Sequence, residues 1–237
     1  MTHTFISSPV SVLTGDAARV ALQSTNDAAH YTEGKGVLSV PLERWQEAQA
    51  YERATWLEHG LMLTEDRNAE HAAMFDDYKA LPYYLGDTIE LGCGPFTNLR
   101  YIIQPNWPKS VTLVDPLFKE YLRHPHCAYP DTVFLGNSIT WSASAIEDYH
   151  TSREFDTLVM INVLSHCTDA QKVFSWINAH IAPGGYLVFH EPARDINPLT
   201  TYDAGHPLSY TQDVIEDFLS GYTQVYRNGD YFIGVKK

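Results

Sequence analysis

The chain has 237 residues, 44% of them hydrophobic, which is enough to bury the core of one domain with an added segment. Its formal net charge of −13 argues against nucleic acid as a partner, because a phosphate backbone attracts the opposite charge. The sequence has neither a signal-peptide pattern nor an apolar run near the roughly 18–20 residues of a membrane span, so no membrane partner is expected.

The three cysteines, Cys93, Cys127 and Cys167, are too few and too scattered for a disulfide framework or a structural zinc site. Cys127 follows His124 and His126, but this cluster is interpreted as part of a loop, and no metal site is predicted. Unpaired cysteines favour a reducing compartment. A cytoplasmic location is therefore expected.

Residues 1–82 are predicted to form an N-terminal helical cap or lid. Pro41 suits a first helical turn and Gly60 suits a helix end, which predicts a helix between them. A second helix is predicted to start at an Asn68 cap and to stop before Pro82.

One face of the first predicted helix carries Trp45, Glu52 and Trp56, since these positions align at 100° per residue. An unpaired carboxylate at the centre of a packing face would be costly. Two interpretations remain open. The face packs on the domain with Glu52 at its border, or it covers a cofactor and walls an acceptor pocket together with Tyr31, as lids do.

Residues 83–237 are predicted to form one α/β unit in which apolar strands alternate with helices. The predicted strands span residues 87–92, 110–116, 131–138, 155–164 and 185–192, and the predicted helices span residues 96–104, 117–124, 142–149, 168–181 and 209–220. Residues 222–237 are predicted to form a hairpin around "RNGD". This alternation indicates a parallel sheet covered by helices on both faces, with an antiparallel hairpin at its edge.

The first of these strands ends in a glycine turn, "IELGCGP". Gly92 and Gly94 allow a tight backbone and the close approach of a ligand, and ligands of open α/β sheets bind at the carboxyl ends of the strands. Asp115 ends the next strand, where a carboxylate can accept hydrogen bonds from ribose hydroxyls. An adenosine-type ligand is indicated, and NAD and S-adenosylmethionine both fit at this point.

Two features separate these ligands. The dinucleotide fingerprint needs G-x-G-x-x-G/A, but Thr97 stands at its third position. Glu90, next to the turn, would repel a pyrophosphate and favour the ammonium and sulfonium groups of S-adenosylmethionine. Both features favour S-adenosylmethionine.

Four segments, "IELGCGP", "VTLVDP", "FDTLVMINVLSH" and "IAPGGYLVFHEP", resemble in order and spacing the motifs of class I S-adenosylmethionine-dependent methyltransferases. The resemblance covers residues 85–237. It implies a doubly wound, Rossmann-like α/β fold whose seven strands follow the order 3-2-1-4-5-7-6, with strand seven antiparallel. "VDPLFKEY", "NVLSHCTD" and "GHPLSYT" are similar to segments of bacterial small-molecule and glycan-cluster methyltransferases.

The resemblance also implies roles for individual residues. Asn137 and Ser138 stand at the end of the predicted third strand and would meet the adenine ring, and Asn162 would line the methyl-transfer site. The full set of positions that match cofactor-binding positions of the superfamily is Glu90, Gly92, Gly94, Asp115, Asn137, Ser138 and Asn162.

The expected reaction is in-line transfer of the sulfonium methyl group to a nucleophilic oxygen or nitrogen, or to carbon, of a small molecule or glycan. A hydroxyl acceptor would need a base within hydrogen-bond reach. His166 and His206 are the candidates, and Glu52 could serve from the lid. His190, at a strand end, is expected to line the acceptor cavity.

Two alternatives remain. One is a nicotinamide-dependent oxidoreductase, which the failed third glycine position and Glu90 disfavour. The other is a non-catalytic sensor or partner subunit that binds S-adenosylmethionine, which the intact glycine turn does not exclude. The sequence indicates neither the identity of the acceptor nor the oligomeric state.

Overall fold

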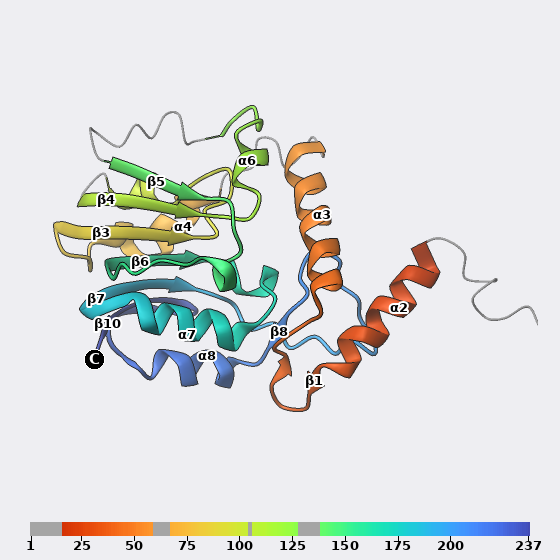
Figure 1. The fold of residues 1–237 in the computed structure, drawn as a ribbon. Helices are drawn as coiled ribbons and strands as arrows, with labels where there is room; N and C mark the ends of the chain where they lie inside the picture. The colour runs from red at the N-terminus through yellow and green to blue at the C-terminus, as the bar shows by residue number, and fades with distance from the viewer. Residues whose placement is uncertain (1–15, 59–66, 104–105, 128–137) are drawn as a thin grey trace, which may run out of the picture.

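The computed structural model describes residues 16–58, 67–103, 106–127 and 138–237. Its centre is a twisted sheet (Figure 1), whose strands are β3 (Tyr84–Leu91), β4 (Trp107–Val114), β5 (Ser138–Ser142), β6 (Phe155–Ile161), β7 (Ile181–His190), β9 (Tyr222–Asn228) and β10 (Tyr231–Lys236). These strands lie in the order β5-β4-β3-β6-β7-β10-β9.

The strand order confirms the predicted topology. The strands β5, β4, β3, β6 and β7 pair in parallel, whereas β10 pairs antiparallel with both β7 and β9. Numbered in chain order within this sheet, the strands follow 3-2-1-4-5-7-6 with the seventh antiparallel. The carboxyl ends of the parallel strands therefore meet at one edge, and the loops of that edge can form a shared site.

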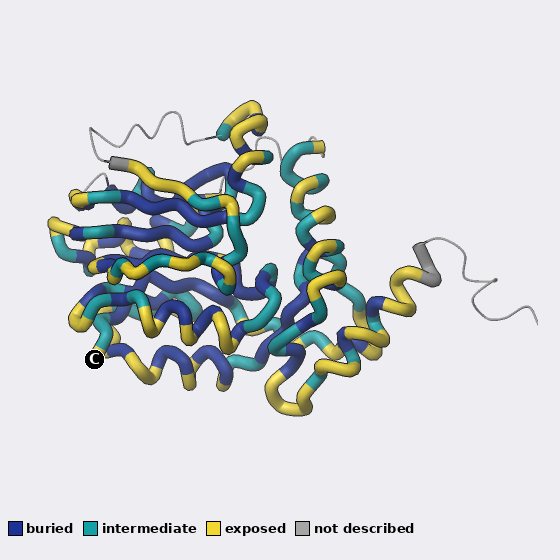
Figure 2. The backbone as a smooth tube through the Cα atoms, in the orientation of Figure 1, coloured by how far each residue is buried: buried dark blue, intermediate teal, exposed yellow. Residues whose placement is uncertain are grey.

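Helices cover both faces of the sheet, because the strands are apolar on both sides. Leu158 and Met160 of β6 pack with α7 (Ala170–His180) and α8 (Gln212–Leu219). The alternate residues Val159 and Ile161 belong to a second core, which includes residues of α4 (Asn68–Met74), α5 (Leu99–Ile102) and α6 (Phe118–Tyr121). Figure 2 shows the buried positions running along the central strands.

The N-terminal part contains the predicted helix as α3 (Leu42–Glu58). A helix that the sequence pattern did not predict, α2 (Asp16–Ala29), precedes it and projects from the body (Figure 1). Between them, β1 (Tyr31–Thr32) and β2 (Gly36–Val37) form a small antiparallel sheet with β8 (Ser209–Tyr210). This sheet joins the N-terminal part to the loop that precedes α8.

The second predicted helix is shorter than expected. The Asn68 side chain donates to the Phe96 carbonyl instead of capping α4, so the predicted cap is wrong. Three successive residues in the left-handed region, Asp76 to Tyr78, form the short 3-10 turn η1 (Asp76–Tyr78) and end the helical path. Tyr78 is fully buried in the core beneath the sheet, so this segment packs as part of the α/β unit, while the predicted boundary at residue 82 stays a prediction.

The third strand was predicted over residues 131–138, and residues 131–137 of that segment lie outside the described residues. The described strand β5 begins at Ser138, the last residue of the predicted segment. The predicted helix over residues 142–149 is only the short 3-10 turn η2 (Ile146–Asp148), and a further turn, η3 (Leu164–His166), follows β6. The alternation within "SITWS" was obscured by its polar residues.

A buried ion pair fastens α3 to its surroundings. The Arg44 Nε atom lies 3.2 Å from Asp27 Oδ1, and the two side chains are 1% and 8% exposed. The same guanidinium donates to the carbonyl oxygens of Asp203 at 2.6 Å and Ala204 at 3.1 Å. Arg44 therefore joins α2, α3 and the loop before β8, and its loss would leave a buried carboxylate without a counter-charge.

We expect Arg44→Met to lower the free energy of unfolding by about 3–5 kcal/mol, because it strands the buried Asp27 charge. Arg53→Met is the matched control on the same helix, since Arg53 forms an exposed pair with Glu58; its effect should stay below about 1 kcal/mol. Urea denaturation of both variants measures the difference. Equal losses in the two variants would contradict the anchoring role of Arg44.

Candidate active site

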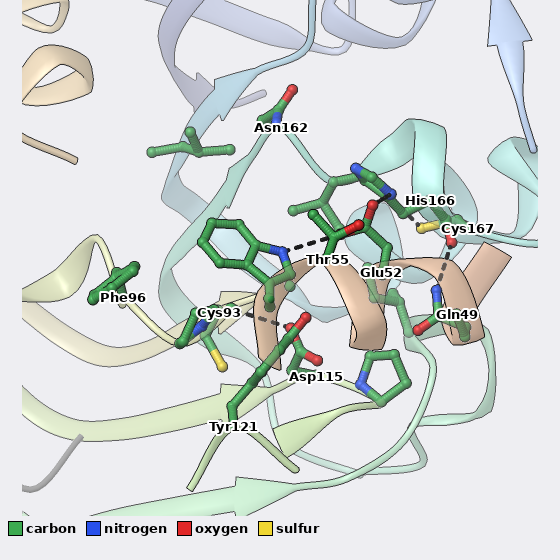
Figure 3. A pocket seen from close by; sticks show the side chains of 18 of the residues that line it. Gln49, Glu52, Thr55, Cys93, Phe96, Asp115, Tyr121, Asn162, His166 and Cys167 are labelled. Atoms are coloured by element: carbon green, nitrogen blue, oxygen red, sulfur yellow. Dashed lines mark hydrogen bonds and ion pairs between the residues drawn. The ribbon is translucent and has the colours of Figure 1, made fainter. Parts of the chain in front are cut away.

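A cavity of about 390 Å³ lies at the carboxyl edge of the parallel strands. Its walls are the glycine turn after β3, the end of β4, the loops after β5 and β6, His206, and one face of α3 (Figure 3). This volume lies in the range of small-molecule sites, and the position is the one where open α/β sheets bind ligands.

The glycine turn has a shape that only glycine tolerates. Gly92 has a φ of 65°, and a Cβ atom there would stand 2.4 Å from both Cγ atoms of Val163. Gly94 has a φ of 53°, but a Cβ there would meet nothing within 4 Å, and the residue lines the cavity. Gly92 is therefore required by the approach of the β6 loop, whereas Gly94 leaves its side open to a ligand.

Glu90 does not line the cavity, and its predicted contact with the cofactor stays a prediction. Among the described residues, its carboxylate receives hydrogen bonds from the Thr97 hydroxyl, the Asn98 amide N–H at 2.9 Å and the Asn98 side chain at 3.1 Å. It is 1% exposed and is not part of the cavity wall, and burial raises its pKa to about 7. Glu90 thus holds the turn in shape, because its hydrogen bonds go to Thr97 and Asn98 of the turn.

Asp115 lies in the cavity wall. Its Oδ2 accepts from the Gly94 amide at 3.0 Å and its Oδ1 accepts from the Leu117 amide at 2.8 Å. Burial raises its pKa to about 6 although both hydrogen bonds oppose that shift. Each carboxylate oxygen keeps acceptor capacity for a second donor, so the group can still bind hydroxyls in the cavity.

The loop after β6 carries Asn162 into the cavity wall. Asn162 has a φ of 58°, which is uncommon for a residue with a side chain, and its amide N–H donates to the His190 carbonyl at 2.7 Å. Buried Glu191 accepts from the amides of Val163 and Leu164, at 2.8 Å for the latter, and from the Tyr210 hydroxyl at 3.1 Å. Strained backbone held by its surroundings is common at functional sites.

His166 lies at the end of this loop, in η3. Its Nδ1 donates to the Gly205 carbonyl at 3.0 Å, which leaves Nε2 as the unprotonated nitrogen of a neutral ring. Burial lowers the pKa of His166 to about 3, and the neighbouring His206 adds to that shift. The ring is therefore neutral near pH 7 and only a weak base.

His206 also lines the cavity, and a carboxylate that the sequence analysis missed orients it. Asp203 Oδ1 lies 2.8 Å from His206 Nδ1, and Asp203 Oδ2 accepts from Arg194 at 2.6 Å. Burial alone would raise the pKa of Asp203, but the hydrogen bond and charge of His206 and the charge of Arg194 lower it to about 2. The ionised carboxylate holds the proton on Nδ1, so Nε2 is the nitrogen available as a base. The signal was the i, i+3 spacing in "DAGH".

The α3 face predicted as a lid lines the cavity. Trp45 and Gln49 donate to the His166 carbonyl at 2.9 and 3.3 Å, and Trp56 donates to Glu52 Oε2 at 3.1 Å. All four side chains belong to the wall, with Glu52 Oε1 3.5 Å from His166 Nδ1 (Figure 3). The helical spacing of 45, 49, 52 and 56 explains why one face reaches the cavity.

Three further predicted site residues among the described ones, Tyr31, His190 and Ser138, do not line the cavity. Tyr31 belongs to the small sheet and packs against the core. His190 stacks on the Tyr231 ring with centroids 3.9 Å apart, and burial lowers its pKa to about 4. Ser142, at the end of β5, accepts from the Asp115 amide, so Ser138 at the start of β5 lies at the opposite edge of the sheet from the cavity. Asn137 lies outside the described residues.

Other wall residues were not predicted from the sequence. They share no motif, because they come from separate elements: Asn68, His71, Phe96, Tyr121, Ile146 and Glu147. The part of the chain described here contains no group of three metal-ligating side chains. No helix within the described ranges is long and apolar enough to cross a membrane. The cytoplasmic location stays a prediction.

The fold and the cavity define a nucleoside-binding class of doubly wound α/β protein. A family model described as a methyltransferase domain matches residues 63–229. The chain therefore belongs to the methyltransferase-domain family and is an enzyme of that kind, which confirms the resemblance in its motifs. A search of curated protein sequences finds no match to the chain.

Several solved structures are similar to this fold. The N-methyltransferase NodS of Bradyrhizobium japonicum WM9, in complex with S-adenosylhomocysteine, has a TM-score of 0.58 and 19% identity, covering 80% of this chain and 98% of that one. The 1,6-didemethyltoxoflavin-N1-methyltransferase of Burkholderia thailandensis, with its acceptor and S-adenosylhomocysteine bound, has a TM-score of 0.55 and 14% identity over 86% of this chain and 95% of its own. At these identities the likeness is one of fold.

The buried carboxyl groups predict how stability depends on pH. The pKa of Glu191 rises from 4.5 to about 7 on folding through burial, so the folded state keeps a proton that the unfolded state releases between these values. The contribution of the protonated Glu191 to the stability of the folded state is complete below pH 4.5 and is lost as the pH rises toward 7. Glu191→Gln should remove this pH dependence. Between pH 4.5 and 7, the free energy of unfolding of the wild type should fall, relative to that of the variant, by on the order of 3 kcal/mol.

Urea denaturation at closely spaced pH values tests this prediction. Glu33→Gln, in the exposed turn between β1 and β2, is the matched control and should track the wild type. Parallel curves for Glu191→Gln and the wild type would show that Glu191 does not retain its proton on folding.

Proposed function

We propose that this enzyme transfers a methyl group from S-adenosylmethionine to a nucleophilic oxygen or nitrogen of a small molecule. The observation that carries the proposal is the cavity in which Gly94 and Asp115 meet the α3 face. The family match supports methyl transfer. NodS and the toxoflavin enzyme, both crystallised with S-adenosylhomocysteine, support this choice of cofactor.

The residues present fit this cofactor. The Asp115 carboxylate retains acceptor capacity for two ribose hydroxyls, and the open side of Gly94 leaves space for the methionine part. Ala145 and Ile146, after β5, offer an apolar surface for the adenine ring, whereas Ser138 begins β5 at the other edge of the sheet. When bound, S-adenosylmethionine supplies an electrophilic methyl group on a positively charged sulfur.

The protein's part in the reaction is alignment and proton removal. The Trp45 and Trp56 wall would exclude water and hold the acceptor in line with the methyl group, which in well-aligned systems is worth about 7–11 kcal/mol. His206 is the proposed general base, because Asp203 fixes its Nδ1 proton and leaves Nε2 free. His166, a weaker base, would orient the loop through its contact with Gly205.

The acceptor is proposed to be a small molecule, with a glycan as one possibility within that class. The toxoflavin enzyme is named for, and was crystallised with, a small-molecule acceptor. A cavity of about 390 Å³ that also holds a nucleoside leaves room for a compact group at the transfer point. Of the alternatives, a non-catalytic S-adenosylmethionine sensor would bind the cofactor without turnover, whereas a nicotinamide oxidoreductase would bind NAD.

The Asp115→Asn variant tests the cofactor assignment. It should weaken S-adenosylmethionine binding by about 1–3 kcal/mol, because a charged acceptor of ribose hydrogen bonds is lost. Calorimetry with S-adenosylmethionine, S-adenosylhomocysteine and NAD measures this change. Exposed Asp213→Asn on α8 is the control and should leave affinity unchanged. NAD binding by the wild type without response to the sulfur nucleosides would end the proposal.

The Asp203→Asn variant tests the proposed base. Without the carboxylate, the His206 ring loses its fixed tautomer, so kcat should fall by about 10²-fold, at the low end of what general-base catalysis contributes. Affinity for S-adenosylmethionine should not change. The rate of S-adenosylhomocysteine release, with an acceptor chosen from a panel of small amines and alcohols, is the readout. Exposed Asp195→Asn is the control, and a kcat equal to that of the wild type would exclude His206 as the base.

A further inference from the structure

The wall that α3 contributes to the cavity carries a single charge, that of Glu52. The other α3 residues of this wall are neutral: Trp45, Gln49, Tyr51, Thr55 and Trp56. The indole N–H of Trp45 donates to the His166 carbonyl, and the indole N–H of Trp56 donates to Glu52 itself. Glu52 is therefore the one acidic group that α3 brings to the cavity.

The Glu52 carboxylate has few donors for a group this buried. Its Oε2 accepts from Trp56 at 3.1 Å. Its Oε1 has one long contact among the described residues, 3.5 Å from His166 Nδ1, and that nitrogen has a closer acceptor in the Gly205 carbonyl at 3.0 Å. The side chain is 16% exposed, and burial raises the pKa of Glu52. An accessible carboxylate in this state gains from a cationic donor.

The other acids of the wall accept from backbone amides. Asp115 accepts from two, and Glu147 Oε1 accepts from the amides of Thr168 and Asp169 and from the Thr168 hydroxyl, whereas the buried Glu147 Oε2 has no partner among the described residues. The wall also contains Arg67, at the start of α4. Of the acids in the wall, Glu52 is the one that lies against His166, and it accepts from no backbone amide among the described residues.

We propose that the methyl acceptor is a small molecule with a primary or secondary aliphatic amine, which enters as its ammonium ion and is bound by Glu52. This inference rests on the proposed methyl transfer and names the acceptor class for that site. Glu52 lies against His166, whose ring centroid is 4.4 Å from that of His206. The carboxylate that binds the ammonium and the base that deprotonates it therefore both lie next to the His166 imidazole.

The chemistry balances with these groups. One ammonium proton passes to His206 Nε2, which leaves a neutral amine with a lone pair. That lone pair forms the new N–C bond as the C–S bond breaks, and the electron pair of the C–S bond goes to sulfur. The products are a methylated ammonium ion, S-adenosylhomocysteine and a protonated His206 that returns its proton to water.

A charge on the acceptor is what the arrangement selects. A carboxylate acceptor would meet the Glu52 charge at short range, where like charges repel most strongly. An alcohol of the same shape would fill the space between the indoles without gaining from the charge. Binding should therefore rank the ammonium ion above the alcohol and the alcohol above the carboxylate.

The experiment uses the full chain saturated with S-adenosylhomocysteine, which permits binding without turnover. Phenethylamine, phenethyl alcohol and phenylacetate are three probes of one skeleton and different charge, and ligand-observed NMR titration measures their affinities. We expect the amine to bind about tenfold or more tightly than the alcohol, with the acid weakest. Glu52→Gln should remove this preference, whereas Glu58→Gln, exposed on the same helix, should keep it.

Mass spectrometry then follows methylation of phenethylamine in the presence of S-adenosylmethionine. Formation of the N-methyl product, reduced in Glu52→Gln through a higher KM, supports the proposal. The proposal is overturned if the alcohol or the acid binds as tightly as the amine, or if the amine does not bind at millimolar concentration. It is also overturned if Glu52→Gln weakens only the binding of S-adenosylhomocysteine and not that of the amine. Failure of S-adenosylhomocysteine to bind at all would instead overturn the proposed function, so the two failures are distinguishable.

Discussion

Buried carboxylates that accept backbone amide hydrogen bonds hold the cavity in shape. Glu90 bonds the start of α5, Asp115 bonds Gly94, and Glu191 bonds the loop after β6. Each comes at or near the end of a parallel strand, so the rigid sheet fixes the carboxylate and the carboxylate fixes a loop. Burial raises the pKa of all three, which shows that the protein gives up some stability near neutral pH to keep these loops in place.

The α3 helix forms one wall of the cavity at the edge of the sheet. Its Arg44 bonds the carbonyls of residues 203 and 204, and Glu52 lies so near Gly205 that a Cβ there would stand 3.0 Å from Oε1. The loop that carries His206 is thus enclosed between α3 and His166, which bonds the Gly205 carbonyl. The proposed acceptor binding and proton removal would therefore depend on α3 and on the loop it contacts. Both lie outside the sheet, in segments where functions on a shared fold most often diverge.

Much of the architecture could be predicted, because hydrophobic alternation and glycine turns are local signals. Four of the five parallel strands, the glycine turn and Asp115 were found in this way. Residues 139–142 of β5 were not predicted as strand, because "SITWS" carries polar residues at an edge of the sheet, where burial does not enforce an apolar pattern. The hydrogen bonds that Glu90 accepts from Thr97 and Asn98 were not predicted either, since these donors become its neighbours only when the turn closes.

The sequence by itself determined the fold class, the strand order through its resemblance to a known family, the glycine turn and the face of α3, since each depends on spacing along the chain. The tertiary structure decided which of these residues meet. It paired His206 with Asp203, brought Glu52 to His166, and turned His190 away onto Tyr231. Such contacts depend on how separate loops pack against one another at a strand edge, and no local pattern in the chain records that packing.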